Sequence, residues 1–185
     1  MKNYFDLKGQ VAVVTGASTG LGLQMAKAFA NQGANLALLA RRMNLLEENA
    51  KAITEEFGVE VLPFACDITV TENVVAAVKA TMERFGRVDI LVNNAGTGAV
   101  ANAEDITDEQ FKHELNIDLF GTFVCAREFG KEMIKAKYGR IINIASMYGL
   151  VGNMIVGSSP YHAAKGGVVN LTRALAAEWG KHGIT

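Results

Sequence analysis

Tyr161 and Lys165 stand four residues apart near the carboxyl end of the chain. On a helix this spacing places both side chains on one face. A phenol has an unperturbed pKa of about 10, and a neighbouring ammonium group favours the phenolate. Tyr161 is therefore a candidate general acid/base for a substrate hydroxyl, and Ser146 is a candidate to hold the substrate oxygen. The alternative is a partly exposed tyrosine beside a solvated lysine.

A glycine-rich turn near the amino end is the second candidate for chemistry. Glycines stand at positions 16, 20 and 22, between a β-branched apolar run and an amphipathic segment. Gly16 permits a sharp turn, Gly20 makes room for a pyrophosphate, and Gly22 lets the helix pack closely on the strand. The helix N-terminus would then attract phosphate groups. A turn that only needs backbone freedom is the alternative.

These residues require a scaffold in which strands and helices alternate. Apolar runs predict strands over residues 11–15, 35–40, 59–65, 88–92 and 140–145, and amphipathic periodicity predicts helices over residues 21–32, 45–57, 71–85, 107–135 and 161–182. Right-handed crossovers place such helices on both faces of a parallel sheet. We therefore expect an α/β protein with a Rossmann-type doubly wound parallel sheet in three α/β/α layers, forming one domain over residues 1–185.

Four motifs in this order resemble the short-chain dehydrogenase/reductase family. They are the TGxxxGxG turn from Thr15 to Gly22, Asn93-Asn94-Ala95-Gly96 after the fourth strand, Ser146 after the fifth, and the Tyr161–Lys165 pair. The resemblance implies an NAD(P)-dependent alcohol/ketone oxidoreductase. In it Ser146 positions the carbonyl, Tyr161 is the general acid/base, and Lys165 lowers the tyrosine pKa and binds the nicotinamide ribose. The implied cofactor contacts in the two loops are Gly16, Ser18, Thr19, Gly20, Leu21, Gly22, Asn94, Ala95 and Gly96.

Asp118 departs from the family pattern. Aligning Gly121-Thr122-Phe123 with the family's N-x-x-G-x-F segment places Asp118 where an asparagine completes the catalytic tetrad. That asparagine acts chiefly through its backbone carbonyl, which Asp118 can still supply, whereas a carboxylate could change the protonation of Lys165. Asn116 lies on another side of the predicted helix and is a poor substitute. Either the replacement is tolerated, or catalysis is altered or lost.

The end of the second predicted strand bears on the choice of cofactor. Ala40 stands where an acidic residue would bind the adenosine ribose of NAD, and Arg41 and Arg42 follow. Guanidinium groups suit a 2′-phosphate, so NADP(H) is preferred and NAD(H) remains possible. Solvated surface arginines are the alternative. Asp67 and Ile68 resemble the family's adenine-contacting pair; an exposed acid at a strand end is the alternative for Asp67.

The substrate is predicted only by resemblance. Residues 148–179 are similar to gluconate 5-dehydrogenase-type members, which favours a sugar acid or polyol over a 3-oxoacyl thioester carried on acyl carrier protein. A catalytically weak NADP-binding sensor or assembly subunit is the rival reading, motivated by Asp118. A Rossmann protein that uses S-adenosylmethionine is disfavoured, because it would not require Ser146, Tyr161 and Lys165 in this order.

Composition excludes several other classes of protein. The net charge of the 185 residues is −1, so no overall field attracts nucleic acid or an anionic membrane, and no apolar stretch reaches the ~20 residues of a membrane span. Cys66 and Cys125 are far apart and lie in apolar runs, which argues against a disulfide or metal site and favours a reducing cytoplasm. The three histidines form no ligand cluster, and His162 is interpreted as a surface residue.

Two expectations concern assembly and length. The resemblance implies a homo-oligomer, a dimer or tetramer, associating through the helices at residues 107–135 and 161–182, with a small molecule as substrate. The family's next segments would be a sixth strand, a substrate-covering region and a seventh strand. We therefore expect the sequence to be a truncated form of a longer protein, ending after the helix that follows the fifth strand.

Overall fold

The sheet of the computed structural model, which describes residues 5–98 and 100–185, contains five parallel strands in the order β3-β2-β1-β4-β5. The strands are β1 (Val11–Thr15), β2 (Asn35–Ala40), β3 (Val61–Ala65), β4 (Ile90–Asn93) and β5 (Arg140–Asn143). The chain runs outward from β1 to β3 and then crosses back to β4 on the other side of β1. The expected Rossmann-type fold is confirmed, with its switch point, where ligands bind in such sheets, between β1 and β4.

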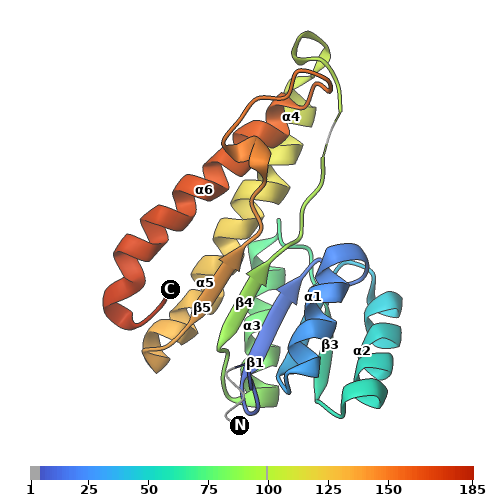
Figure 1. Ribbon diagram of the computed structural model, residues 1–185, viewed down its shortest axis with the longest axis vertical. Coiled ribbons are helices and arrows are strands. Elements are labelled where there is room, and N and C mark those ends of the chain that lie inside the picture. The colour runs from blue at the N-terminus through green and yellow to red at the C-terminus, as the bar shows by residue number, and fades with distance from the viewer. Residues whose placement is uncertain (1–4, 99) are drawn as a thin grey trace.

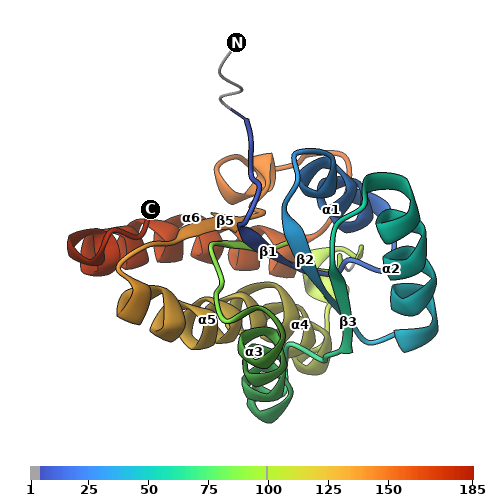
Figure 2. The same ribbon diagram turned by 90° about the horizontal axis from the view of Figure 1, so that it is seen from below.

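Helices cover both faces of the sheet. The helices are α1 (Gly20–Asn31), α2 (Met43–Phe57), α3 (Thr71–Phe85), α4 (Asp108–Leu115), α5 (Thr122–Ala136) and α6 (Ser159–Trp179). Figure 2 shows α1 and α2 on one side of the strands and α3 and α5 on the other, and Figure 1 shows α6 alongside α5. In Figure 1, α4 and the start of α6 extend beyond the carboxyl ends of the strands.

The two cores follow from the alternation of side chains along each strand. Val14 faces the core under α1 and α2, whereas its neighbour Val13 faces the core under α3 and α5. Both valines are fully buried, as expected of strands covered on both faces. Phe129 and Met133 of α5 fill the second core. This double burial makes the central strands a rigid platform for the loops at their carboxyl ends.

The helix predicted over residues 107–135 is interrupted. Its start is as expected, because Thr107 accepts a hydrogen bond from the Gln110 backbone N–H and its own N–H donates to the Gln110 side chain. Between α4 and α5, however, the segment η2 (Asn116–Gly121) is π-helical. α-Helical periodicity does not reveal such a segment, and π-helical turns often accompany functional sites. Asp118 lies in this segment, fully buried.

Several element ends also differ from the sequence-based prediction. β3 begins at Val61 rather than at residue 59, because the Glu60 backbone N–H donates to the Asn35 side chain at 2.9 Å. β4 spans Ile90–Asn93 instead of residues 88–92, and β5 ends at Asn143 instead of residue 145. α6 begins at Ser159, with Pro160 in its first turn, where a missing N–H costs little. Within the described residues, no helix combines the length and apolarity needed to span a membrane.

Candidate active site and cofactor groove

An open groove of about 450 Å³ runs along the carboxyl ends of β1, β2 and β3 and the loop after β4. Of the residues predicted to bind cofactor, those lining it are Gly16, Ser18, Thr19, Arg41, Arg42, Asp67, Ile68, Ala95 and Gly96. The predicted contacts Gly20, Leu21, Gly22 and Asn94 are not among the lining residues. The residues predicted for catalysis lie behind Gly96 and outside the groove itself.

The glycine turn has the conformation that a phosphate-binding loop needs. Gly16 and Gly20 have φ of +67° and +59°, in the left-handed region where a side chain is strained. A Cβ on Gly20 would meet only open space, so the surface there is free for a ligand. A Cβ on Gly22 would collide with the Gly16 carbonyl oxygen, which explains this glycine by close packing. The first N–H groups of α1 have no side-chain cap, so they are available to a phosphate.

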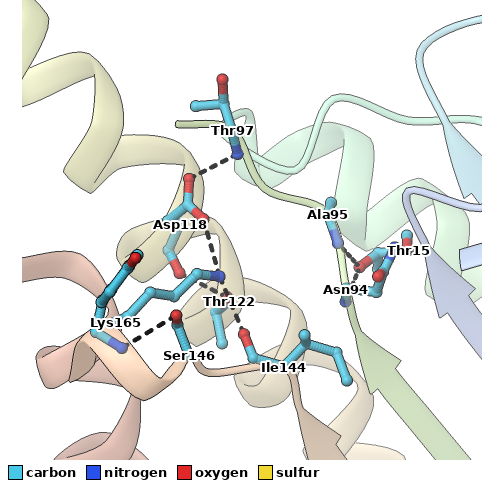
Figure 3. A network of polar contacts seen from close by, with 10 residues as sticks. Thr15, Asn94, Ala95, Thr97, Asp118, Thr122, Ile144, Ser146 and Lys165 are labelled. Carbon is cyan, nitrogen blue, oxygen red and sulfur yellow. Dashed lines mark hydrogen bonds and ion pairs between the residues drawn. The ribbon is translucent and has the colours of Figure 1, made fainter. Parts of the chain in front are cut away.

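Asn94 stabilises the groove from behind. Its side-chain amide donates to the Thr15 carbonyl at 3.0 Å, and the Thr15 hydroxyl accepts the backbone N–H groups of Asn94 and Ala95 at 3.0 Å each (Figure 3). The same hydroxyl donates to the Val92 carbonyl. These bonds join the ends of β1 and β4, so Asn94 holds the two groove-forming loops together.

Positive charge gathers at the β2 end of the groove. The Arg42 guanidinium donates to the hydroxyls of Ser18 at 3.0 Å and Thr19 at 3.2 Å, which places it against the glycine turn. The pKa of Asp67 is lowered, first by the hydrogen bond from the Thr69 hydroxyl, and also by the Thr69 backbone N–H and the charges of Arg41 and His113. The Asp67 carboxylate therefore faces a groove that otherwise carries cations.

A closed ion pair lies directly behind Gly96. Lys165 Nζ is 2.9 Å from Asp118 Oδ1, and the two side chains are only 6% and 0% exposed. The other carboxylate oxygen accepts the Thr97 backbone N–H at 2.9 Å, and Lys165 Nζ donates to the Ile144 carbonyl at 3.0 Å (Figure 3). The loop after β4, η2, β5 and α6 all contribute to this cluster.

Tyr161 and Ser146 flank the ion pair. Lys165 Nζ lies 5.5 Å from the centroid of the Tyr161 ring, one helical turn earlier on α6. Ser146 lies two residues after Ile144, and its hydroxyl accepts the Tyr148 backbone N–H at 3.2 Å. The cluster thus brings a phenol, an ammonium group and a hydroxyl to the end of β5, next to the groove. Such groups can hold an oxygen and exchange a proton with it.

Sequence reasoning missed several groove residues, among them three on α4 and η2. His113 of α4 and Asn116 and Ile117 of η2 line the groove opposite Arg41 and Asp67. Their spacing of i, i+3 and i+4 on the helix that begins at Thr107 is the signal that could have found them. Asn116 therefore faces the groove and Asp118 the lysine, in agreement with the prediction that Asn116 is a poor substitute at the lysine.

His162, interpreted from the sequence as a surface residue, is half-buried, and its Nε2 atom is inaccessible to solvent. Its ring stacks on Tyr148 with centroids 4.7 Å apart, and Nδ1 lies 2.8 Å from the Ser158 carbonyl oxygen. A carbonyl can only accept, so Nδ1 carries a proton and donates it to this oxygen. Nε2 is buried, and no partner for it lies within the described part of the chain. The segment 147–158 covers the histidine, which sequence periodicity on α6 alone does not reveal.

A second groove, of about 500 Å³, lies between α3 and α5. Its walls are formed by Val75, Val78, Lys79, Met82, Glu83, Glu128, Lys131 and Glu132. No residue predicted for catalysis or cofactor binding lines it, so we place the functional site at the sheet edge. Residues 5–98 and 100–185 contain no group of three or more histidine, cysteine or acidic side chains suited to a metal ion.

Comparison with known proteins agrees with this geometry. A 40% identical relative over 182 residues is a subunit of (2S)-[(R)-hydroxy(phenyl)methyl]succinyl-CoA dehydrogenase from Thauera aromatica, with 97% of this chain and 71% of the relative covered. D-threitol dehydrogenase from Mycolicibacterium smegmatis is 39% identical, with 97% and 68% covered. NADP-dependent mannitol dehydrogenase from Alternaria alternata is 37% identical, with the same coverage of 97% and 68%.

A solved structure gives the same result in three dimensions. The crystal structure of an NAD⁺-bound xylitol dehydrogenase superimposes with a TM-score of 0.92 at 35% identity, covering 96% of this chain and 68% of the other. The family model for short chain dehydrogenases matches residues 10–185. The chain therefore belongs to the short-chain dehydrogenase family and is an oxidoreductase that acts on CH–OH groups.

Proposed function

We propose that the protein is an NADP(H)-preferring dehydrogenase that interconverts a secondary alcohol and a ketone through Ser146, Tyr161 and Lys165. The observation that carries the proposal is the convergence of these three residues behind Gly96, at the end of the groove. Lys165 Nζ bonds to the Ile144 carbonyl, two residues before Ser146, and lies 5.5 Å from the Tyr161 ring centroid. Together they supply a proton-exchanging phenol, a cation and a hydroxyl at one point.

Each residue has a distinct task in the proposed reaction. A nicotinamide cofactor held in the groove would supply the hydride chemistry. Ser146 holds the substrate oxygen, and Tyr161 takes the proton from the alcohol or returns it to the ketone. Lys165 has three N–H donors; it donates one hydrogen bond to the Ile144 carbonyl and forms an ion pair with Asp118 Oδ1. We assign a remaining N–H donor of Lys165 to a ribose hydroxyl of the cofactor.

The preference for NADP(H) rests on the arginines at the end of β2. Arg42 is held against Ser18 and Thr19 in the glycine turn, and Arg41 lies near Asp67. A 2′-phosphate at this end would meet two guanidinium groups and no acid from β2, which ends in Ala40. Titration of Arg42→Ala and Arg41→Ala with both cofactors tests this preference. Affinity for NADPH should fall about tenfold and affinity for NADH little; an equal loss for both contradicts it.

The substrate class is a sugar acid or polyol. D-threitol and mannitol dehydrogenases among the relatives support this choice, whereas the relative named for a succinyl-CoA substrate supports a thioester. A panel of polyols, sugar acids and 3-oxoacyl thioesters, assayed with both cofactors, separates the two classes. Turnover confined to thioesters would overturn the proposed class and leave the proposed chemistry intact.

The proposed role of Tyr161 has a direct test. In Tyr161→Phe only the hydroxyl is removed, so kcat should fall about 10²- to 10⁴-fold while NADPH binding is retained. Tyr138→Phe is a matched control, because Tyr138 lies at the far end of α5, over Arg140. A Tyr161→Phe variant with more than half of the wild-type activity would end the assignment.

A second candidate function is a cofactor-binding subunit with weak catalysis. The closed Asp118–Lys165 pair favours it, because a lysine whose charge is offset assists a phenol less. In that case the wild-type protein binds NADPH, shows no turnover with the substrate panel, and is unchanged by Tyr161→Phe.

A further inference from the structure

Asp118 and Lys165 are the most enclosed pair of opposite charges near the groove. The acid is 0% exposed and the lysine side chain 6% exposed. Lys165 is the only lysine that is buried within residues 5–98 and 100–185. Because a buried charge without a partner is costly, each member of the pair constrains the other.

The surrounding backbone fixes the pair in one arrangement. The carboxylate is held by the Thr97 N–H, and the ammonium group by the Ile144 carbonyl. The Thr122 hydroxyl donates to the backbone carbonyl of Asp118 at 2.9 Å, which supports the π-helical turn that carries the acid. A Cβ on Gly96 would lie 2.5 Å from Asp118 Oδ1 and 3.5 Å from Lys165 Nζ. The carboxylate therefore packs directly against the Gly96 backbone, and a side chain at position 96 would displace it.

The position of the carboxylate has an electrostatic consequence for Tyr161. An ammonium group near a phenol favours the phenolate, and a carboxylate at 2.9 Å from that ammonium offsets part of its charge. We propose that Asp118 is a positioning residue that holds Lys165 in place and offsets its charge, so that alcohol oxidation needs a higher pH than it would with a neutral residue at 118. This proposal rests on the proposed function of Tyr161.

Other charged groups near the pair are engaged elsewhere or face the groove. On α6, His162 is bound to Ser158, and Tyr161 is the group under discussion. On η3 (Met147–Gly149), Tyr148 accepts a hydrogen bond from the Asn153 side chain. On α4, His113 lines the groove and Glu114 is buried. On α5, Arg127 and Lys131 each form an ion pair with Glu128.

The test is the pH dependence of alcohol oxidation in Asp118→Asn, which removes the charge and keeps the shape. The pH at which kcat reaches half of its maximum should move about one unit lower than in the wild type. Asp108→Asn is the control, because this acid lies at the start of α4, is 86% exposed, and should leave the profile unchanged. An unchanged profile in Asp118→Asn, or a shift to higher pH because the lysine loses its proton, overturns the proposal.

A measurement on the wild-type protein remains decisive if Asp118→Asn does not fold. In ¹⁵N-lysine-labelled protein, the ammonium group of Lys165 should give one signal protected from solvent exchange. A folded wild type without such a signal overturns the proposal. An active wild type with an unshifted Asp118→Asn profile refutes this inference alone. If both the wild type and Asp118→Asn bind NADPH but neither turns over any substrate, the proposed function is refuted, and this inference with it.

Discussion

Two buried aspartates at opposite ends of the sheet make the same kinds of contact with different results. At the amino end, Asp89 accepts the Val11 backbone N–H at 2.8 Å and two hydrogen bonds from Arg87 at 2.8 and 2.6 Å. At the carboxyl end, Asp118 accepts the Thr97 N–H at 2.9 Å and pairs with Lys165. Each carboxylate therefore has one backbone donor and one cation.

The difference lies in the cation. Arg87 is 54% exposed, and its pKa is raised by its hydrogen bond to Asp89, so this pair fastens β4 to β1 with water nearby. Lys165 is buried and also faces Tyr161. A buried carboxylate therefore stabilises the sheet edge when its cation reaches solvent, and affects chemistry when its cation is shared with a reactive group. Three substitutions, ordered by expected loss of stability, test this distinction.

The largest loss is expected for Asp118→Ala. Lys165 would then be buried beside the Ile144 carbonyl without an acid, and breaking a buried pair from one side costs about 3–5 kcal/mol. Urea unfolding of the wild type and variant measures this free energy. The double variant Asp118→Ala/Lys165→Met removes both charges and should recover more than half of the loss. If the free energy of unfolding of Asp118→Ala lies within about 1 kcal/mol of the wild-type value, Lys165 does not need the acid for stability, and the proposed difference between Asp118 and Asp89 is contradicted.

A smaller loss is expected for Arg87→Met. Asp89 keeps the Val11 N–H, and water can reach the space of the half-exposed guanidinium, so the free energy of unfolding should fall by about 1–3 kcal/mol. Turnover per folded molecule should not change, because this end of the sheet is remote from the groove.

Arg84→Met is the matched control for that substitution. Arg84 makes an exposed ion pair with Glu60 at 2.7 Å, and such pairs contribute about 0–1 kcal/mol. Equal losses for the two arginine variants, measured by urea unfolding, would show that burial of Asp89 adds nothing. A loss of turnover in Arg87→Met would contradict the assignment of this end to stability alone.

The sequence predicted the sheet because each strand is a short apolar run between helical segments. β1 and β2 have the predicted bounds, since these central strands are buried on both faces and their apolar runs coincide with the residues that pair in the sheet. Strand ends are set by partners distant in sequence, as the bond between Glu60 and Asn35 illustrates. The π-helical turn η2 depends on burial of Asp118 and on the Thr122 hydroxyl, neither of which alters the apolar period.

The candidate site was predictable where spacing alone determines geometry. The glycine turn and the Tyr161–Lys165 pair are local patterns, and both have the expected placement on strand, turn and helix. The direct contact between Asp118 and Lys165 joins residues 47 positions apart, and requires the crossing of η2 over α6. The sequence indicated that a carboxylate replaces an asparagine at 118 and could affect Lys165, but not that the two side chains form a buried ion pair.

The smallest loss is expected for Asp67→Asn, a third aspartate, which lies in the groove and is only partly buried. The Thr69 hydroxyl and backbone N–H donate to it at 2.7 and 2.9 Å, and these bonds, with Arg41 and His113, lower its pKa.

A carboxyl group with a lowered pKa in the folded state stabilises the fold above its unfolded pKa, and this contribution is lost as the pH falls through the folded pKa. Asp67→Asn should therefore reduce stability by less than about 1 kcal/mol at pH 7, because solvent screens the site, and the difference from the wild type should shrink as the pH falls below about 4, the unfolded value, and through the lowered folded pKa. Urea unfolding at several pH values measures both effects, with Glu55→Gln on exposed α2 as the control. A loss as large as that of Arg87→Met, or one that does not depend on pH, would show that exposure of the cation does not decide how strongly an aspartate stabilises this sheet.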